Sequence, residues 1–388
     1  MKKTIKLIGN IGILLFTILL CLLVGELIIR LFIGTKNIVI LATPPIIKDK
    51  ELVYRNAPNW KGKLWYSSLQ GFYEVRVNSM GLNEREVNFK KEKNKPRILF
   101  LGDSITFGIG VDVDKTFVRI VENLLNFQLS YNPTLSGIRR VETLNGGVPA
   151  YHSWQEIAFL RKIGLKYQPD IVVLDFYLND VEPYKSAREI KQFREDKFAS
   201  LKYRYNVPLP FKDFLREKSR LYWVGRRVCN LMIAKLFSTT QTPRNKKTQD
   251  APPLPFDKWK TDRSEFLNLT YVNRFDWGAP WNSDACYDNF RKYIRELKDL
   301  AQKNNFKLVI VFFPVEYQLE TTFLEDNPQG KFTKIAGEED VLFLDLLPLM
   351  RDCNIRPDSL YFDWCHLTLK GHQFTAEKIS QFLREHDI

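Results

Sequence analysis

The sequence is poor in residues that bind metals or carry out redox chemistry. It has five cysteines and four histidines among 388 residues, and no two cysteines form a CxxC pair. Neither a zinc site nor a thioredoxin-like motif is therefore indicated. Cys21 lies in the apolar N-terminus, and the other four cysteines could pair in an oxidising compartment, with a connectivity that sequence does not define. There is also no internal repeat. With 45% apolar and 13% aromatic residues, the chain can bury a core, which excludes global disorder.

An apolar run at residues 7–25 follows three lysines, and residues 27–33 extend it. A helix of this length spans about 28 Å, close to the roughly 30 Å hydrocarbon core of a bilayer. A cleaved signal peptide is the alternative, but no A-x-A site is present, and Cys21 follows Leu20 rather than the small residue of a lipoprotein site. We predict that residues 1–34 are a cytoplasmic N-terminus and an uncleaved transmembrane signal anchor, with the rest of the chain outside the cytoplasm.

The net charge of +13 is concentrated in one segment. Residues 185–263 contain 20 lysines and arginines against 8 acidic residues. A basic surface suits nucleic acid, anionic lipid headgroups or acidic polysaccharide. An extracytoplasmic location makes nucleic acid the least suitable partner, so we expect none. A solvated helical surface without any partner is the alternative.

The middle and end of the chain alternate between two patterns. Residues 35–96 are predicted to form a stalk and a small β element, since Phe72, Val75 and Val77 alternate with polar residues. From residue 97, short apolar runs alternate with amphipathic segments. Strands are expected at 97–101, 141–144, 171–176, 308–313 and 341–344, and helices at 116–125, 153–167, 284–304 and 368–383. This order predicts an α/β domain over 97–388, with a five-stranded, mostly parallel sheet covered on both faces. A mostly helical insertion is expected at about 185–283, with an amphipathic stretch at 221–237.

Chemically active residues follow four of the predicted strands. An open parallel sheet carries its functional groups beyond the carboxyl ends of its strands, so these residues are expected to converge. Ser104 is a candidate nucleophile that needs a base, which His366 can supply. Asp363 can hold the second nitrogen of that imidazole. The backbone N–H groups of Ser104 and Ala150, with the side chain of Asn179, can stabilise an oxyanion.

The same residues resemble a known family. Gly102-Asp103-Ser104, Asn179-Asp180 and Asp363-x-x-His366 look like motif blocks of the SGNH (GDSL) hydrolases, and the resemblance covers roughly residues 70–185 and 284–385. It implies a flavodoxin-like three-layer sandwich and the hydrolysis of an ester or, less often, acyl transfer, with no cofactor and no metal. By this resemblance Ser104 is the nucleophile, His366 the base, Asp363 its orienter and Asn179 the oxyanion-hole amide.

Two positions depart from the family's pattern. Its second block has the form Asn-x-Gly-x-x-Gly, and here Asn145, Gly147 and Ala150 occupy those positions. Alanine keeps the backbone N–H, but it adopts a positive φ less readily than glycine. The usual glycine of the third block, two residues before Asn179, is Tyr177 in this chain. We expect Tyr177 to narrow the pocket.

Several further residues near these blocks are candidates for lining the pocket. They are Asp103, Gly147, His152, Tyr177 and Asp180. Asp103 and Asp180 can instead hold their own loops, and His152 can lie in a surface turn. His372 and His386, in or after the last predicted helix, are expected to be solvated.

These observations predict a membrane-anchored serine ester hydrolase that acts through an acyl-serine intermediate. Its ester-bearing substrate is expected to be an O-acetylated envelope polysaccharide or a lipid. One alternative is an acyltransferase that moves an acyl group to a glycan hydroxyl. Another is a catalytically silent, membrane-anchored module whose basic insertion holds an anionic polymer or surface.

Overall fold

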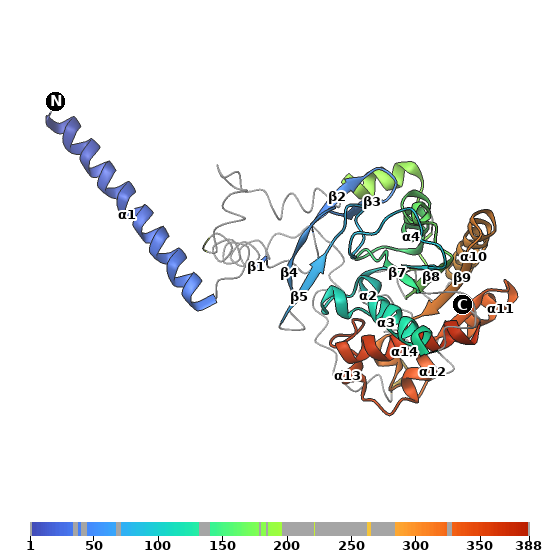
Figure 1. The fold of residues 1–388 in the computed structure, drawn as a ribbon. Coiled ribbons are helices and arrows are strands. Elements are labelled where there is room, and N and C mark those ends of the chain that lie inside the picture. The colour runs from blue at the N-terminus through green and yellow to red at the C-terminus, as the bar shows by residue number, and fades with distance from the viewer. Residues whose placement is uncertain are drawn as a thin grey trace. The chain divides into compact units, whose positions relative to one another are not determined.

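The structure is a computed structural model that describes most of the chain (Figure 1). The described residues are 2–33, 38–39, 45–66, 71–131, 140–177, 180–183, 185–195, 221, 262–264, 284–323 and 328–386. Most of the predicted insertion, including all but one residue of the 221–237 stretch, lies outside them. The chain divides into two compact units, residues 1–40 with 201–246 and residues 41–200 with 247–388.

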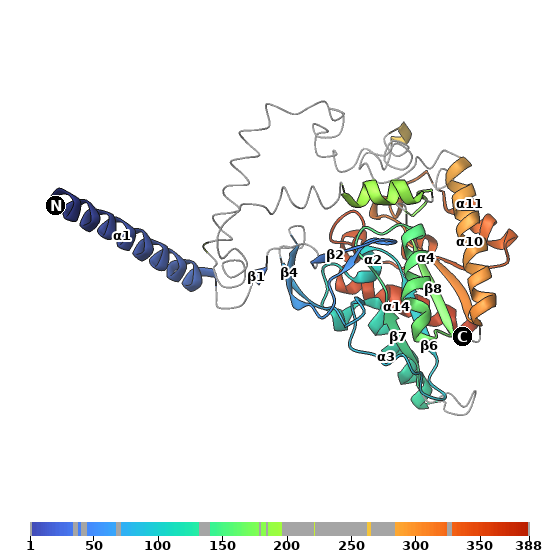
Figure 2. The same ribbon diagram turned by 90° about the horizontal axis from the view of Figure 1, so that it is seen from above.

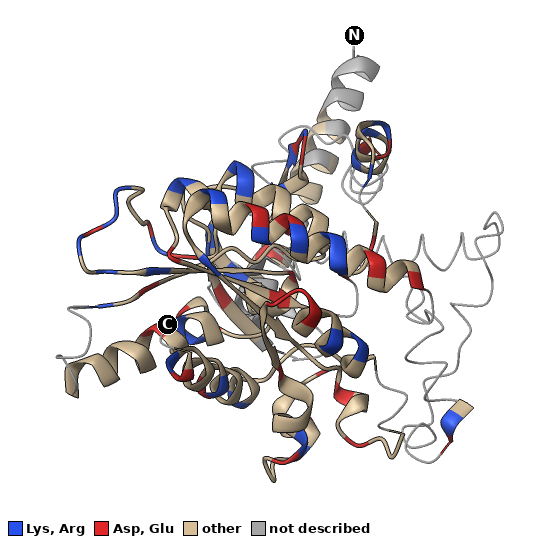
Figure 3. Cartoon of the chain, turned by 90° about the vertical axis from the view of Figure 1, so that its right-hand side faces the viewer, with Lys and Arg blue, Asp and Glu red and all other residues tan. Residues whose placement is uncertain are grey.

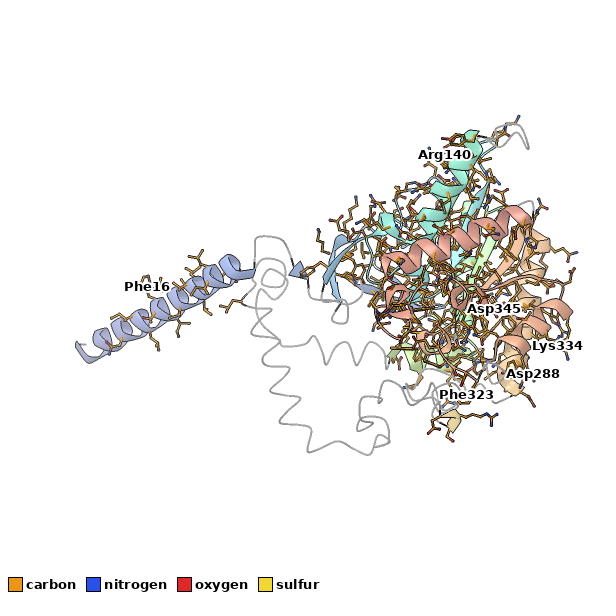
Figure 4. All side chains as sticks on the ribbon, turned by 90° about the horizontal axis from the view of Figure 1, so that it is seen from below. Phe16, Arg140, Asp288, Phe323, Lys334 and Asp345 are labelled. Carbon is orange, nitrogen blue, oxygen red and sulfur yellow. The ribbon has the colours of Figure 1, made fainter. Side chains whose placement is uncertain are left out.

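In the first unit the structure describes helix α1 (Lys2–Ile33), the two-residue strand β1 (Ile38–Val39) and Leu221. Many apolar side chains project from α1, such as that of Phe16, which is 67% exposed (Figure 4). The Glu26 carboxylate accepts a hydrogen bond from the backbone N–H of Leu221 at 2.9 Å. Within the described part of the chain, no helix has the combination of length and apolarity that crossing a membrane requires. The structure thus gives the N-terminus a helix, but it does not support the predicted transmembrane anchor.

The second unit is built on a five-stranded parallel sheet. Its strands are β6 (Arg97–Leu101), β7 (Glu142–Asn145), β8 (Ile171–Phe176), β9 (Lys307–Phe312) and β10 (Leu342–Asp345). Their order in the sheet is β10-β9-β8-β6-β7, and every pair is parallel. This is the doubly wound order of flavodoxin-like folds, in which the chain reverses direction beside the first strand. The predicted α/β fold with a five-stranded parallel sheet is confirmed.

Helices cover both faces of this sheet, which explains why its central strands are mostly apolar. One face packs against α4 (Ser153–Lys162), α10 (Asp284–Asn304) and α11 (Gln329–Glu338). The other packs against α3 (Phe117–Tyr131), α12 (Leu346–Arg351) and α14 (Leu369–Glu385). Figures 1 and 2 show α3 beside α14, and Figure 3 shows the strands between two helical layers on which positive and negative residues are mixed.

A small β element precedes the sheet in the same unit. Strands β2 (Ile46–Asp49) and β3 (Val53–Asn56) pair antiparallel, as do β4 (Lys61–Tyr66) and β5 (Gly71–Arg76). The alternation at residues 72–77 predicted β5, but nothing predicted β2, β3 or β4. Leu64, Tyr73 and Val75 of the second pair are buried against Phe107 and Ile109 of the sheet domain. The element is therefore packed onto the sheet domain.

The second unit also contains shorter elements. They include α2 (Ser104–Phe107), α13 (Pro357–Leu360) and the 3-10 turns η1 (Val113–Lys115), η2 (Gly164–Tyr167) and η3 (Glu316–Gln318). The α2 helix begins at the candidate nucleophile, directly after β6.

Candidate active site

The candidate nucleophile stands at the start of a tight turn between β6 and α2. Asp103 forms the N-cap of α2, and its carboxylate accepts a hydrogen bond from the Ile105 N–H at 2.8 Å. A side chain at Gly102 would overlap Thr106, because an added Cβ would lie 2.1 Å from the Thr106 hydroxyl oxygen. Glycine is therefore required there, and the turn presents Ser104 partly exposed between buried neighbours.

Ser104 and His366 meet although 262 positions separate them in the chain. The Nε2 atom of His366 lies 2.9 Å from the Ser104 hydroxyl oxygen, and its Nδ1 lies 2.8 Å from a carboxylate oxygen of Asp363. With Nδ1 protonated and donating to Asp363, Nε2 accepts from the serine hydroxyl. The structure thus brings the three predicted residues together in the order that a general-base mechanism requires.

Asp363 is held by its own loop as well as by His366. Its second carboxylate oxygen accepts hydrogen bonds from the backbone N–H groups of Cys365, at 3.0 Å, and His366, at 2.7 Å. Burial by itself raises the pKa of the Asp363 carboxyl, but the hydrogen bonds and the charge of His366 outweigh it and bring the pKa below its usual value. Asp363 is therefore a carboxylate at neutral pH, which stabilises an imidazolium at His366.

A cysteine lies next to this histidine. The Cys365 sulfur is buried and lies 3.4 Å from His366 Nδ1. Cys365, Asp363 and His366 are the one group of metal-binding side chains in the described residues whose ligand atoms lie within 4.8 Å of one another. A divalent ion there would take the same atoms that form the triad. The described cysteines, Cys21, Cys286, Cys353 and Cys365, are free thiols.

The loop after β7 packs against the nucleophile's helix. The Asn145 side chain donates to the Thr106 carbonyl at 2.7 Å and accepts from the Gly147 N–H at 3.0 Å. A Cβ at Gly147 would lie 2.2 Å from the Phe107 nitrogen. The role of Gly147 visible in the structure is thus close packing, because only glycine lets this loop approach α2.

Ala150, which occupies the last position of the second motif block, adopts the left-handed backbone conformation. Its φ is +62°, and the residue is partly exposed. In the part of the chain that the structure describes, the N–H groups of Ala150 and Ser104 make no hydrogen bond. Both N–H groups could therefore donate to an oxyanion, and their predicted role in an oxyanion hole stays a prediction. Asn179, the predicted third donor, lies outside the described residues and stays a prediction.

The other predicted pocket residues serve their loops or lie beside the triad. Asp180 is buried and accepts a hydrogen bond from the Tyr177 N–H at 2.6 Å, which closes the turn after β8. Tyr177 is itself buried, with its ring centroid 6.2 Å from that of Trp364. His152 is also buried, so it is not a surface-turn residue, and its Nε2 lies 3.7 Å from the Glu182 carboxylate. His372 is 1% exposed, which corrects the expectation that it is solvated.

Two buried acids near this site had no motif that could reveal them. Asp175, inside β8, accepts a hydrogen bond from the Thr106 hydroxyl at 2.6 Å and so ties α2 to the sheet. Burial raises the pKa of Asp175 and of Glu156 well above the usual values, and in both cases the charge of Asp103 adds to the effect. The one signal in the sequence is the acidic residue that interrupts the apolar run of β8.

Comparison with known proteins gives a family match over most of the chain. The sequence profile of the family described as GDSL-like Lipase/Acylhydrolase matches residues 98–379. Similar solved structures include a lipolytic protein of the G-D-S-L family from Desulfitobacterium hafniense DCB-2, at 12% identity, 74% of this chain, 100% of that chain and a TM-score of 0.37. They also include LAE5, an alpha/beta hydrolase enzyme from the metagenome of Lake Arreo, Spain. It is 14% identical, the match covers 76% of this chain and 96% of that chain, and the TM-score is 0.39. A third is a catalytic mutant of Axe2, an acetylxylan esterase from Geobacillus stearothermophilus. It is 15% identical, the match covers 75% of this chain and 93% of that chain, and the TM-score is 0.39. No curated protein matches the chain.

Proposed function

Because this chain belongs to the GDSL-like lipase/acylhydrolase family and is a hydrolase of ester bonds, we propose that it cleaves its substrate through an acyl intermediate on Ser104. The observation that carries the proposal is the 2.9 Å distance between the Ser104 hydroxyl oxygen and His366 Nε2. A serine hydroxyl is a weak nucleophile until a neighbouring base takes its proton as the new bond forms.

In the first step, Ser104 Oγ attacks the carbonyl carbon of the ester and its proton moves to His366 Nε2. The former carbonyl oxygen becomes an oxyanion, to which the N–H groups of Ser104 and Ala150 donate. The imidazolium at His366 is stabilised by the Asp363 carboxylate at Nδ1. As the tetrahedral species collapses, the bond to the alcohol breaks and the alcohol leaves with the proton from Nε2.

In the second step, water takes the place of the alcohol. It attacks the acyl carbon and gives a proton to His366 Nε2, and the same two N–H groups hold the second oxyanion. Collapse breaks the bond between the acyl carbon and Ser104 Oγ, which recovers the proton from Nε2 as the acid leaves. The Asn179 side chain is proposed as a third donor in both steps.

The proposed substrate is an acyl ester of an envelope polysaccharide or of a lipid. This choice follows from the extracytoplasmic location that the sequence predicts for the domain, which is part of the same proposal. Fusions to alkaline phosphatase and to a cytoplasmic reporter test the location. An active phosphatase fused after residue 388 supports it, and an active cytoplasmic reporter at the same position contradicts it.

A fluorophosphonate probe, which phosphonylates an activated serine, tests the nucleophile. Wild type should gain one adduct by intact mass, and Ser104→Ala should gain none. Ser359→Ala, which removes another partly buried serine of the same unit, is the matched control and should label like wild type. Labelling that persists in a folded Ser104→Ala variant would falsify the assignment. Release of free acid, measured with and without a sugar acceptor, separates hydrolysis from acyl transfer.

A further inference from the structure

The carbonyl of the peptide that links Pro149 to Ala150 accepts a hydrogen bond from a buried tyrosine. The hydroxyl of Tyr54, on β3, lies 2.8 Å from the Pro149 carbonyl oxygen and 2.9 Å from that of Ala150. Tyr54 is 2% exposed, so these carbonyls are its hydrogen-bond acceptors in place of water. The Pro149 carbonyl and the Ala150 N–H belong to the same peptide group.

The contact is reciprocal. The hydroxyl of Tyr151 donates to the backbone carbonyl of Tyr54, and the two rings pack edge to face with centroids 5.4 Å apart. Residues on both sides of Tyr54 also make hydrogen bonds to this part of the chain. Asn56 donates to the Gly147 carbonyl at 3.4 Å, and the Leu52 carbonyl accepts from Gln155 at 2.8 Å. The β3 strand is thus fastened along the loop that contains Ala150.

A fixed carbonyl also fixes the N–H on the opposite side. The described chain has no cis peptide, and a trans peptide is planar, so its C=O and N–H point in opposite directions. Holding the Pro149 oxygen therefore sets the direction of the Ala150 N–H. A hydrogen bond received by the carbonyl also polarises the amide and strengthens its N–H as a donor.

The alanine makes this support necessary. Glycine reaches a φ of +62° with little strain, whereas a residue with a Cβ is disfavoured in the left-handed region. Without an external hold, Ala150 would tend to return to negative φ and turn its N–H away. A buried tyrosine hydroxyl on a neighbouring strand provides such a hold.

We propose that Tyr54 is a positioning residue of the active site, which keeps the Ala150 N–H aligned for the oxyanion. This rests on the proposed function, in which that N–H is an oxyanion donor. The β element before the sheet then supports the active site, and Tyr54 acts on it through the loop at residues 149–150. Its effect falls on the transition state, because the N–H acts on charge that develops only there.

The test is the variant Tyr54→Phe, which removes the hydroxyl and keeps the ring. Loss of a whole oxyanion donor costs about 10² to 10³ in kcat, so misorienting one should lower kcat about tenfold while KM changes less than about twofold. The matched control is Tyr167→Phe. It removes another buried tyrosine hydroxyl, from a residue just before β8, at the end of the strand away from the site. Its kcat should equal that of wild type.

Ala150→Gly separates positioning from a merely structural role. In the Tyr54→Phe background it should restore kcat to within about threefold of Ala150→Gly alone, because glycine keeps the positive φ without the hydroxyl. An equal loss of kcat from Tyr54→Phe in both backgrounds, or no loss in either, overturns the inference. If Tyr54→Phe does not fold, Tyr151→Phe takes its place with the same rescue and the same criteria.

Fluorophosphonate labelling keeps the two proposals apart. If wild type does not label at Ser104, the proposed function fails. If wild type and Tyr54→Phe label at Ser104 at the same rate, the proposed function stands and the role of Tyr54 is refuted.

Discussion

The ring of Phe362 lies almost parallel to that of His366, with centroids 5.8 Å apart and an interplanar angle of 14°. Phe362 also packs against the small cluster that the second β pair forms with the hydrolase core. Phe362 thus connects this β pair to His366. Its ring also lies directly against Gly110, because a Cβ added at Gly110 would be 2.4 Å from it.

Phe362→Leu should therefore lower kcat through the position of the imidazole. Leucine fills much of the volume but offers no flat surface, so the ring gains freedom and the alignment of Nε2 with Ser104 deteriorates. We expect a loss of about fivefold to tenfold in kcat with a small change in KM. Steady-state kinetics on a chromogenic ester measure it. Phe382→Leu removes the ring that packs on the exposed His386 and should leave kcat unchanged. Equal kcat in both variants contradicts the role of Phe362.

Asp363→Asn should lower kcat by about 10³ to 10⁴, because the amide no longer selects the tautomer with a proton on Nδ1 nor stabilises the imidazolium. This expectation rests on the 2.8 Å distance between the Asp363 carboxylate oxygen and His366 Nδ1, and on the lowered pKa of the Asp363 carboxyl. Asp358→Asn makes the same change of charge at an exposed position on α13 and should retain full activity. A folded Asp363→Asn enzyme within tenfold of wild type would show that the histidine needs no orienting carboxylate.

Much of the sheet could be predicted from the sequence, and the reason lies in its burial. Strands covered on both faces appear as continuous apolar runs, so 97–101 and 171–176 match β6 and β8 at both ends. The helix at 284–304 also matches α10, because its buried residues recur at helical spacing. Ser104, Asp363 and His366 could be found because each lies at the edge where parallel strands end.

What the sequence could not reveal depends on partners that are distant in the chain. Tyr54 and Ala150 are 96 positions apart, and no local pattern marks a tyrosine that supports a loop of another segment. His372 lies in an amphipathic helix beside polar residues, so its burial follows only from the packing of α14 on α3. There its Nδ1 accepts a hydrogen bond from the N–H of Phe117, the first residue of α3. Strands β2 to β4 lack even the loose alternation of apolar and polar residues that predicted β5.

Zinc should inhibit the enzyme reversibly at the triad. Cys365, His366 and Asp363 present sulfur, nitrogen and oxygen within 4.8 Å, which are the ligand types that Zn²⁺ takes. A bound ion would remove Nδ1 from Asp363. Burial raises the pKa of the Cys365 thiol, and the charge of Asp363 adds to this, so zinc must displace a proton and should inhibit more strongly as pH rises.

Titration of activity with zinc, followed by addition of EDTA, measures this inhibition. Cys365→Ser should raise the concentration for half-inhibition by at least about tenfold, while Cys353→Ser, which changes a thiol that contacts the Met350 carbonyl, should not. Equal zinc sensitivity of the two variants excludes Cys365 as a ligand.

The stability of the fold should decrease on acidification because of His372. Its Nδ1 accepts the Phe117 N–H at 3.1 Å, and its ring stacks on that of Phe117 at 5.7 Å. Burial lowers the pKa of His372 from its model-compound value of 6.5 to about 3, and the charge of His366 adds to this. Between these values the unfolded chain binds a proton that the folded chain does not, so the free energy of unfolding falls as pH decreases, by about 1.4 kcal/mol per pH unit from this residue.

Urea unfolding at pH 7, 6, 5 and 4, with activity-independent detection by fluorescence, measures the slope. His372→Asn keeps an acceptor near the Phe117 N–H but does not titrate in this range. It should be less stable than wild type at pH 7, because the stacked ring is lost, and the difference should shrink toward pH 4. His386→Asn alters an exposed histidine at the end of α14 and should follow the wild-type curve throughout. Parallel curves for wild type and His372→Asn would mean that the buried imidazole is not the group that makes the fold sensitive to acid.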